Sequence, residues 1–384
     1  MKTICVVTGT RAEYGLLKPI LKKISFSKTL HLQLVVTGTH LIPEFGKTET
    51  DIIDDGFQID ARVPLILYGD NKNSMAHSIG HGVIAFSQVI DLLSPDIIIV
   101  LGDRYEIFAA AISTVYSGKV LAHISGGDKT KGGYDEYTRH AITKLSHIHF
   151  PDTEMSAVRI KRMGENPETV HVCGSSSIDT ILSADFLSKK DLLNQLEINP
   201  KSSYFLLVYH PVSVNPEDAK YQMEAIFEAL LNFKQHIIVI YPNIDPGGLE
   251  IIKVIDSYSN NYPNRITVFK NLPHIVYLNL LKFADALIGN SSSGIVEAPS
   301  FHLSFVNLGK RQEQRERSMN VIDSNFNVDE IKNKIEYCLY DNNFREKLKN
   351  CENVYGDGHA SDIICKTLEE IEIDDSIFEK SIEY

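Results

Sequence analysis

Short apolar runs alternate with helical segments along the whole chain, and this alternation constrains the fold more than any other feature of the sequence. In the first half, the expected strands are Thr3–Thr8, Leu32–Thr37, Ile97–Leu101, Val120–Ile124, Ile148–Phe150 and Thr169–Cys173. In the second half, they are Tyr204–Tyr209, His236–Tyr241, Arg265–Phe269, Ala286–Ile288 and Ser304–Asn307. Strands that alternate with helices form parallel sheets with right-handed crossovers.

A polar stretch at residues 183–203, which contains several lysines and serines, interrupts the alternation and is the best candidate for a linker. The chain has 384 residues, more than one hydrophobic core usually supports. We therefore expect an α/β protein of two doubly wound, Rossmann-like domains that face a cleft, at residues 1–183 and 204–361. Residues 362–384 form an acidic tail with a helical pattern, which we expect to pack across the domains.

The composition excludes several classes of function. The chain carries 50 acidic and 38 basic side chains, a balance that argues against a general nucleic-acid binder but leaves room for a local basic cleft. Its five scattered cysteines are typical of reduced thiols and not of a disulfide or zinc framework. The N-terminus has no signal-peptide pattern, and no apolar run approaches membrane-spanning length. We expect a cytoplasmic protein with no nucleic-acid or membrane partner.

Four carboxylates, together with arginine and histidine side chains, are expected to meet at one edge of the first sheet. They follow the strands at 97–101 and 120–124 or open the next helix. Parallel strands end at the same edge of a sheet, where ligands bind. The set is Asp103, Arg104, Asp128, Asp135, Glu136, Arg139 and His140. A reaction site explains this grouping better than packing does.

Two strand-to-helix turns have the composition of an anion site. Arg11 follows the first strand in Thr-Gly-Thr-Arg, where it binds a phosphate or is a solvated arginine in a tight turn. In Gly-Asn-Ser-Ser-Ser-Gly, the serines 291–293 have hydroxyls and N–H groups for a diphosphate, and Glu297 has acceptors for ribose hydroxyls. The alternative is a serine N-cap with Glu297 completing a capping box. Because one cap needs only one serine, we favour the phosphate site.

Further polar residues follow strands of the second half. His210 is expected to face the cleft, either as a functional group or as a structural hydrogen-bonding histidine. Asn243 and Asp245 bind a nucleoside or a phosphate, or they form an Asx-turn before a proline. Arg311 provides a positive charge for binding a phosphate.

No cofactor or metal is expected. The turn that carries Arg11 has neither the Gly-x-Gly-x-x-Gly dinucleotide fingerprint nor the Walker lysine, which disfavours nicotinamide cofactors and ATP hydrolysis. His77 and His81 share one helix face, but no glutamate completes a His-Glu-x-x-His pattern there.

Together and in this order, these motifs resemble those of the hydrolysing UDP-N-acetylglucosamine 2-epimerases of sialic-acid and related nonulosonic-acid biosynthesis. The resemblance runs from Thr8 to about Gly358. Its pieces include Gly-Thr-Arg11-Ala-Glu-Tyr, Thr-Gly-Thr-His40-Leu, Leu-Gly-Asp103-Arg104, Asp135-Glu136-Tyr-Thr-Arg139-His140, His210-Pro211, Tyr-Pro-Asn243-Ile-Asp245, Gly-Asn-Ser291-Ser292-Ser293-Gly, Gly-Lys-Arg311-Gln and Tyr-Gly-Asp-Gly358. It implies a fold like that of the two-domain GT-B glycosyltransferases, and association as homodimers or homotetramers.

The resemblance also implies roles for the candidate residues. The implied catalytic set is Asp103, Asp135 and His210, with Asp128 and Glu136 in reserve. His40, Arg104 and Arg139 are implied near the sugar or the diphosphate. UDP is implied to be held by Arg11, Asn243, Asp245, Ser291, Ser292, Glu297 and Arg311.

One departure from the family pattern affects the choice of the base. Many relatives carry His-x-Glu-Gly-Gly-Glu, where this chain reads His123-Ile-Ser125-Gly-Gly-Asp128. The first acid is absent and the second is one methylene shorter. The base, and the sugar substituents at C4 and C6, therefore stay open.

The expected reaction converts UDP-N-acetylglucosamine and water to UDP and N-acetylmannosamine. No carbonyl acidifies the C2 proton of the sugar, so cleavage of the C1–O bond must run ahead of proton removal, and the site must stabilise departing UDP. One carboxylate then takes the proton to leave a glycal, and a second group protonates C2 while water adds at C1. The alternatives are the same reaction on UDP-N,N'-diacetylbacillosamine for legionaminic acid, a glycosyltransferase of the same fold, and a sugar-nucleotide-binding regulator.

Overall fold

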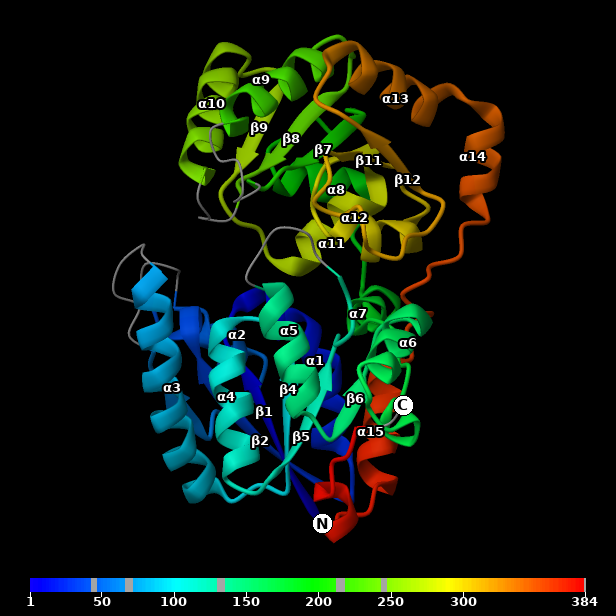
Figure 1. Ribbon diagram of the computed structural model, residues 1–384. Helices are drawn as coiled ribbons and strands as arrows, with labels where there is room; N and C mark the ends of the chain where they lie inside the picture. Colours follow the sequence, from blue (N-terminus) through cyan, green and yellow to red (C-terminus); the bar gives the residue numbers. More distant parts are fainter. Residues whose placement is uncertain (43–46, 66–71, 130–134, 212–217, 243–246, 383–384) are drawn as a thin grey trace. The chain divides into compact units, whose positions relative to one another are not determined.

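The computed structural model describes residues 1–42, 47–65, 72–129, 135–211, 218–242 and 247–382. The chain forms two compact units, which are labelled by element in Figure 1. The first unit comprises Met1–Asp128, Tyr134–Leu182 and Tyr355–Tyr384, and the second comprises chiefly Ser183–Val354.

The first unit is built on a six-stranded parallel sheet in the order β3-β2-β1-β4-β5-β6. The strands are β1 Lys2–Thr8, β2 Leu30–Thr37, β3 Ala61–Val63, β4 Ile97–Leu101, β5 Val120–Ile124 and β6 Ile148–Phe150. The helices are α1 Arg11–Phe26, α2 Glu49–Asp54, α3 Lys72–Leu93, α4 Tyr105–Tyr116, α5 Asp135–Leu145, α6 Glu154–Arg162, α7 Ser176–Ser183 and α15 Ala360–Glu370. Apolar side chains of α1 and α15 pack on one face of the sheet, and those of α3 and α4 pack on the other. Strands covered on both faces read as continuous apolar runs.

The second unit repeats this plan, in the strand order β12-β11-β10-β7-β8-β9. Its strands are β7 Tyr204–Val208, β8 His236–Ile240, β9 Ile266–Phe269, β10 Ala286–Gly289, β11 Phe305–Leu308 and β12 Val321–Ser324. Its helices are α8 Lys189–Gln195, α9 Ala219–Leu230, α10 Gly248–Asn261, α11 His274–Phe283, α12 Ser293–Val296, α13 Val328–Tyr340 and α14 Asn342–Lys349. The largest apolar cluster lies between the sheet and α9, α10 and α13. Two doubly wound α/β units confirm the expected fold class.

In each sheet, the strand order reverses at one point, between β1 and β4 in the first unit and between β7 and β10 in the second. Ligands of open α/β sheets bind outside the carboxyl ends of the strands at such a point. In the second unit, the strands approach so closely there that Gly289, at a φ of 136°, is required. A Cβ at this position would lie 1.9 Å from the carbonyl oxygen of Val208.

The sequence predicted most strands but was wrong at three places. The expected strand Thr169–Cys173 is absent from the described residues, where a single bridge pairs His149 with Val170. The strands β3 and β12 were missed. Each is a short strand at the edge of its sheet, with polar residues such as Arg62 and Asp323, and therefore gives a weak apolar signal.

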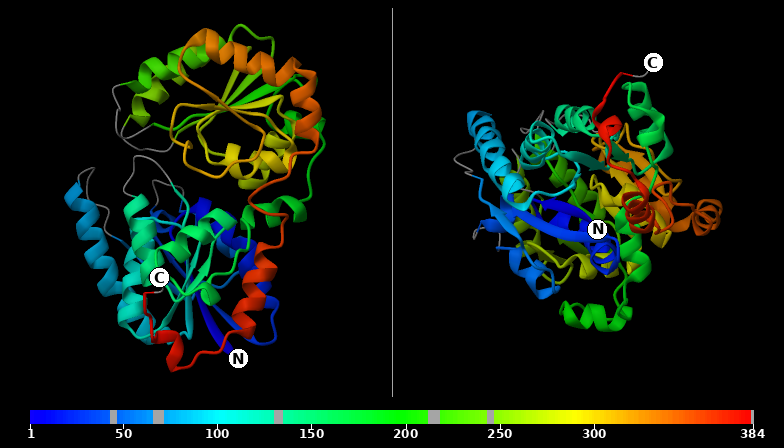
Figure 2. Two further views of the ribbon diagram at one scale, coloured as in Figure 1. Left: turned by 45° about the vertical axis from the view of Figure 1, so that its right-hand side comes forward. Right: turned by 90° about the horizontal axis from the view of Figure 1, so that it is seen from below.

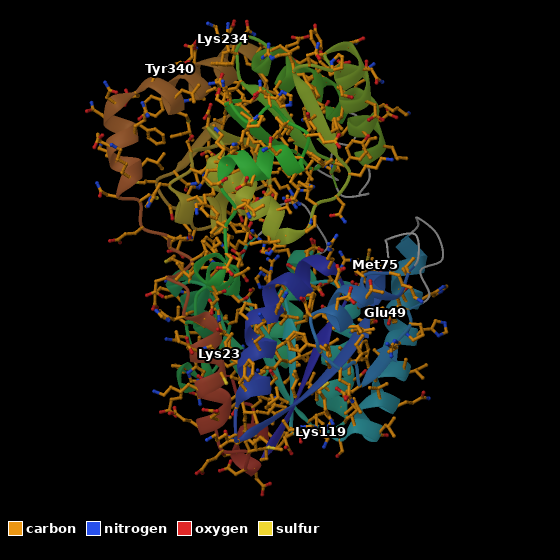
Figure 3. The ribbon with its side chains drawn as sticks, turned by 180° about the vertical axis from the view of Figure 1, so that it is seen from behind. Lys23, Glu49, Met75, Lys119, Lys234 and Tyr340 are labelled. Atoms are coloured by element: carbon orange, nitrogen blue, oxygen red, sulfur yellow. The ribbon has the colours of Figure 1, made fainter. Side chains whose placement is uncertain are left out.

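The C-terminal segment of the chain belongs to the first unit, where α15 packs beside α1 (Figure 2). Lys2 on β1 donates to the carbonyls of Leu368 (2.9 Å) and Glu369 (2.8 Å) at the end of α15. On α1, Lys23, labelled in Figure 3, pairs with Asp362 at 2.5 Å. These contacts tie residues 362–382 to the first unit, and packing across both domains stays a prediction.

The structure locates the domain boundaries more finely than composition does. The chain leaves the first unit after Leu182 and returns to it at Tyr355. The polar stretch 183–203, expected as a linker, lies in the second unit and contains α8, which packs on α11. Within the described ranges, no helix has the length and apolar character needed to cross a membrane.

Asp179, on α7, is expected to support the return of the chain into the first unit. Its buried carboxylate accepts hydrogen bonds from the backbone N–H groups of Ala360 (3.1 Å) and Ser361 (2.8 Å) at the start of α15. Asp179→Ala removes this cap, so we expect the free energy of unfolding to fall by about 1–2 kcal/mol in urea titrations. The control is Asp54→Ala, at an exposed position, which should change it by no more than about 0.5 kcal/mol. Equal losses in the two variants would contradict the capping role.

Candidate active site

Arg139 is the centre of a charged cluster at the carboxyl ends of β4 and β5. Its guanidinium lies on α5, is 2% exposed, and donates to the carboxylate of Asp103 beyond β4. It also donates to the carboxylate of Glu136 (2.9 Å), one turn earlier on α5, and to the carbonyl of Asp128 (3.0 Å) beyond β5. Burial disfavours its charge, yet Asp103 and its neighbours raise the pKa of Arg139. The cluster therefore has a permanent cation at its centre.

Around this cation, the structure brings together most of the residues that the sequence placed at this edge. The second oxygen of the Glu136 carboxylate pairs with Nε2 of His140 at 3.0 Å, so both of its oxygens are engaged. Asp135 is exposed, at the first position of α5. One carboxylate oxygen of Asp103 contacts the buried guanidinium of Arg139.

A second charged group lies where β1 and β4 end. Arg104 donates through Nε to Glu106 at 2.6 Å and lies 3.9 Å from the carboxylate of Glu13. The backbone N–H of Gly9 donates to the other oxygen of Glu13 at 2.7 Å. Sequence reasoning named Arg104 but missed both glutamates. Their signal was present in the quoted motif Arg11-Ala-Glu and in the residue two places after Arg104.

Two residues implied near the substrate have partners within the first unit. Arg11, the first residue of α1, pairs with Asp51 on α2 at 2.9 Å and is partly exposed. His40 is fully buried, and its ring nitrogens lie 3.1 Å from the hydroxyl of Thr8 and 2.8 Å from that of Thr48. Burial lowers the pKa of His40 to about 4, so the ring is neutral near pH 7. These surroundings are those of a structural histidine.

Ser125, the residue at which the chain departs from the family pattern, contacts a further carboxylate. It follows β5 with a φ of 62°, a backbone region uncommon for residues other than glycine. Its hydroxyl donates to Asp152, beyond β6, at 2.9 Å. Sequence reasoning did not name Asp152, although it follows a predicted strand as the other acids do.

In the second unit, Asn290 organises the residues around the point where the strand order reverses. Its side-chain oxygen accepts from the backbone N–H of His210 (2.7 Å), and its side-chain nitrogen donates to the carbonyl of His210 (2.8 Å). The backbone carbonyl of Asn290 accepts from Arg311 (3.0 Å) and from Gln312 (2.9 Å). One amide residue thus connects the segments that follow β7, β10 and β11. Burial and the charge of Arg311 lower the pKa of His210 to about 3, so its imidazole is neutral.

The serine turn after β10 is held by a chain of hydroxyl groups. Ser291 and Ser293 lie 3.0 Å apart through their hydroxyls, and the hydroxyl of Tyr277 on α11 contacts that of Ser293. Tyr277 is a further residue that sequence reasoning missed. Tyr277 lies 14 residues before Ser291, on another helix, so no local pattern connects it with the turn.

The capping-box alternative is not what the structure shows. Ser292 precedes α12 without a side-chain cap, and Glu297 pairs with Nε2 of His274 at 2.9 Å. The helix expected after the serines is only the single turn of α12, so a helix dipole adds little for an anion here. Asn243 and Asp245 lie outside the described residues. Among those that are described, no group of three or more His, Cys, Asp or Glu side chains is arranged to hold a metal ion.

Two Rossmann-like units, each with polar side chains gathered where its strand order reverses, define a two-domain α/β protein of the doubly wound class, whose members bind ligands at such sheet edges. The family model described as UDP-N-acetylglucosamine 2-epimerase matches residues 22–369. The chain therefore belongs to the UDP-N-acetylglucosamine 2-epimerase family.

Relatives and solved structures agree with this membership. A UDP-N,N'-diacetylbacillosamine 2-epimerase (hydrolyzing) from Legionella pneumophila is 38% identical, over 100% of both chains. A GDP/UDP-N,N'-diacetylbacillosamine 2-epimerase (hydrolyzing) from Campylobacter jejuni is 37% identical, over 87% of this chain and 88% of the relative. The crystal structure of UDP-GlcNAc 2-epimerase from Neisseria meningitidis, bound to UDP-GlcNAc, has a TM-score of 0.81, 20% identity, and covers 96% of this chain and 99% of its own. At that identity, the structural likeness shows the fold.

Removing the guanidinium of Arg139 should destabilise the first unit. Arg139→Met leaves the carboxylates of Asp103 and Glu136 near each other without their shared cation, so we expect a loss of about 3–5 kcal/mol in the free energy of unfolding. Arg139→Lys keeps the charge but not the planar fork, and it should recover only part of that loss. Urea titrations followed by circular dichroism measure both values. Full stability of the Arg139→Met variant would contradict the central role of this cation.

Proposed function

We propose that this protein is a hydrolysing 2-epimerase of a UDP-linked 2-acetamido sugar, releasing UDP and the free sugar with inverted configuration at C2. The observation that carries this proposal is the Asp103–Arg139 pair in a chain of this family, with Asp135 and Asp128 on the adjoining segments. The names of the two relatives described above, both hydrolysing 2-epimerases, support the hydrolysing reaction.

For the sugar, we propose UDP-N,N'-diacetylbacillosamine ahead of UDP-N-acetylglucosamine. The sequence alone favoured UDP-N-acetylglucosamine over UDP-N,N'-diacetylbacillosamine. The relatives that are 38% and 37% identical are named for the diacetylated sugar, whereas a UDP-N-acetylglucosamine 2-epimerase from Neisseria meningitidis serogroup B is 31% identical. The absence of an acid at Ser125 is in keeping with a different set of sugar substituents. The family resemblance adds that the protein acts as a homodimer or homotetramer.

In the proposed elimination, the C1–O bond breaks and its electron pair leaves with UDP. One oxygen of Asp103 is held by Arg139, and the other accepts the C2 proton, so that the C2–H electron pair forms the C1–C2 double bond of a glycal. Glu136 has both oxygens engaged and serves to orient Arg139 and His140. The guanidinium of Arg104 stabilises negative charge on the departing diphosphate.

In the proposed hydration, water adds its oxygen to C1 and a proton reaches C2 from the opposite face of the ring. Asp135, exposed on the first turn of α5, is the proposed proton donor, with Asp128 as the alternative. The family resemblance implies a catalytic role for His210, which is the proposed acceptor of the proton that water releases. One water is consumed overall, and the steps need no oxidant or reductant.

The second unit is the proposed UDP site. The guanidinium of Arg311 is fixed on the carbonyl of Asn290, where it can pair with the diphosphate. The hydroxyls of Ser291 and Ser292 donate to phosphate oxygens, and Glu297, oriented by His274, accepts from ribose hydroxyls. Arg11, Asn243 and Asp245 stay predictions for this ligand.

Incubation with each UDP-sugar in heavy water tests the reaction. We expect UDP and a free manno-configured sugar with deuterium at C2, because the proton added there comes from an exchangeable group. The value of kcat/KM should be about 10–100-fold higher for the diacetylated substrate, because a site that hydrogen-bonds the 4-acetamido group discriminates against its absence. Mass spectrometry and proton NMR identify the products. A UDP-linked epimer would instead show a non-hydrolysing enzyme, and UDP release without epimerisation would exclude epimerase activity.

A pair of variants tests the division of roles between the units. Ser291→Ala should weaken UDP binding in calorimetry by about 1.5–3 kcal/mol, the value of a charge-assisted hydrogen bond. Asp103→Asn should leave UDP affinity unchanged but lower turnover by about 10²–10⁴-fold, because it removes basicity and keeps shape. Ser259→Ala, on α10, is the matched serine control. Equal UDP affinities for Ser291→Ala and Ser259→Ala would show that the serine turn is not part of the UDP site.

A further inference from the structure

Two buried carboxylates share one guanidinium where β1 and β4 end, and the proposed reaction does not explain them. Glu13, on α1, is 7% exposed, and Glu106, on α4, is 0% exposed. Arg104 is 2.6 Å from Glu106 and 3.9 Å from Glu13, through the same Nε atom. Arg104 itself is partly exposed, so it has one side toward the glutamates and another toward solvent or ligand.

Each glutamate also has a buried oxygen that accepts no hydrogen bond from the described residues, namely Oε1 of Glu13 and Oε2 of Glu106. A buried ionised carboxylate normally has donors on both oxygens, because leaving one bare costs the full desolvation penalty. Close packing of two glycines covers Glu106. A Cβ on Gly9 would lie 2.7 Å from Cγ of Glu106, and a Cβ on Gly38 would lie 3.1 Å from Oε1 of the same residue.

The charges around Arg104 also disfavour two ionised glutamates. The charged groups that act on Glu13 are Glu106, Arg104 and Asp103, and Asp103 is already paired with Arg139. On the neighbouring turn, His40 is neutral and adds no positive charge. With both glutamates ionised, the group around Arg104 therefore has a net charge of −1. A surplus anion here would oppose the diphosphate of the proposed substrate.

We propose that Glu13 and Glu106 hold one proton between them and act together as positioning residues for Arg104. In this state, a single negative charge anchors the guanidinium, and the group as a whole is neutral toward an incoming diphosphate. Two carboxylates in one low-dielectric site share a proton for the same reason in other proteins, since both cannot ionise cheaply. The inference rests on the proposed function only for the identity of the anion that Arg104 contacts.

The titration of Glu13 supports this geometry. Burial, and then the charge of Glu106, raise the pKa of Glu13 from 4.5 to about 8, against the opposing effects of Arg104 and the Gly9 N–H. A raised carboxyl pKa means that the folded protein keeps a proton that the unfolded chain releases. The proton is therefore held at neutral pH, and it is lost as the pH rises through about 8, which leaves the second negative charge beside Arg104.

The test compares Glu13→Gln and Glu106→Gln with the wild type. Glutamine at 13 imitates a protonated carboxyl that cannot ionise, whereas glutamine at 106 removes the anion that binds Nε of Arg104. We measure KM and kcat for the UDP-sugar from about pH 6 to about pH 10, and record infrared spectra for the C=O band of a buried protonated carboxyl. Glu154→Gln, at an exposed position on α6, is the control for loss of one glutamate charge.

In the wild type and the control, KM should rise by up to about tenfold per pH unit above the pKa of Glu13, with a smaller change in kcat. Glu13→Gln should abolish this rise, and Glu106→Gln should raise KM at every pH. The infrared band should be present in the wild type at neutral pH, disappear at high pH, and be missing from Glu13→Gln.

A wild type without this band, or with the same pH dependence of KM as Glu13→Gln, would overturn the shared proton. If the protein turns over no UDP-sugar at any pH, the proposed function fails by itself. The infrared titration needs no substrate, and it still decides the protonation of the pair.

Discussion

The buried guanidinium of Arg139 is the interaction on which the polar edge of the first sheet depends. It joins segments from three elements, because its acceptors come from the turn after β4, the turn after β5 and the first turn of α5. A guanidinium cannot lose its proton, so it remains a permanent cation that holds the carboxylates of Asp103 and Glu136 in fixed positions. The acids gathered at this edge would otherwise repel one another. One cation thus lets a reactive group of carboxylates exist at the end of a folded sheet.

In the second unit, a neutral amide side chain, and not a charged group, holds the residues at the strand reversal in place. Asn290 hydrogen-bonds to the backbone of His210 in both directions, across the point where the strand order reverses. Its own carbonyl then positions Arg311 and Gln312. A neutral centre suits a unit that is proposed to receive a phosphate anion, because the amide of Asn290 adds no negative charge beside the arginine. The two units share a strand order but differ in how they fix the side chains at its reversal.

The sequence predicted the architecture well because buried parallel strands read as unbroken apolar runs, as in β4 and β5. It missed β3 and β12, whose edge positions require few apolar residues. Motif reasoning located Asp103, Glu136 and Arg139 together, since residues that follow parallel strands share an edge. It did not foresee that His40 is fully buried, or that Glu13, Tyr277 and Asn290 hold other site residues in place. Such supporting roles depend on contacts between distant segments, and no local pattern encodes them.

The hydrophobic core of the first unit is complete only after α15 has been synthesised. This apolar core includes Ala360, Ile364 and Leu368 of α15, so the face of the sheet that α1 and α15 share is only partly covered until those residues are available. The second unit is nearly continuous and lies earlier in the chain than α15. During synthesis on the ribosome, the second unit can therefore complete its core before the first, although it begins later. Loss of α15 by truncation would expose part of the apolar core of the unit that was made first, and this would favour aggregation of the nascent protein.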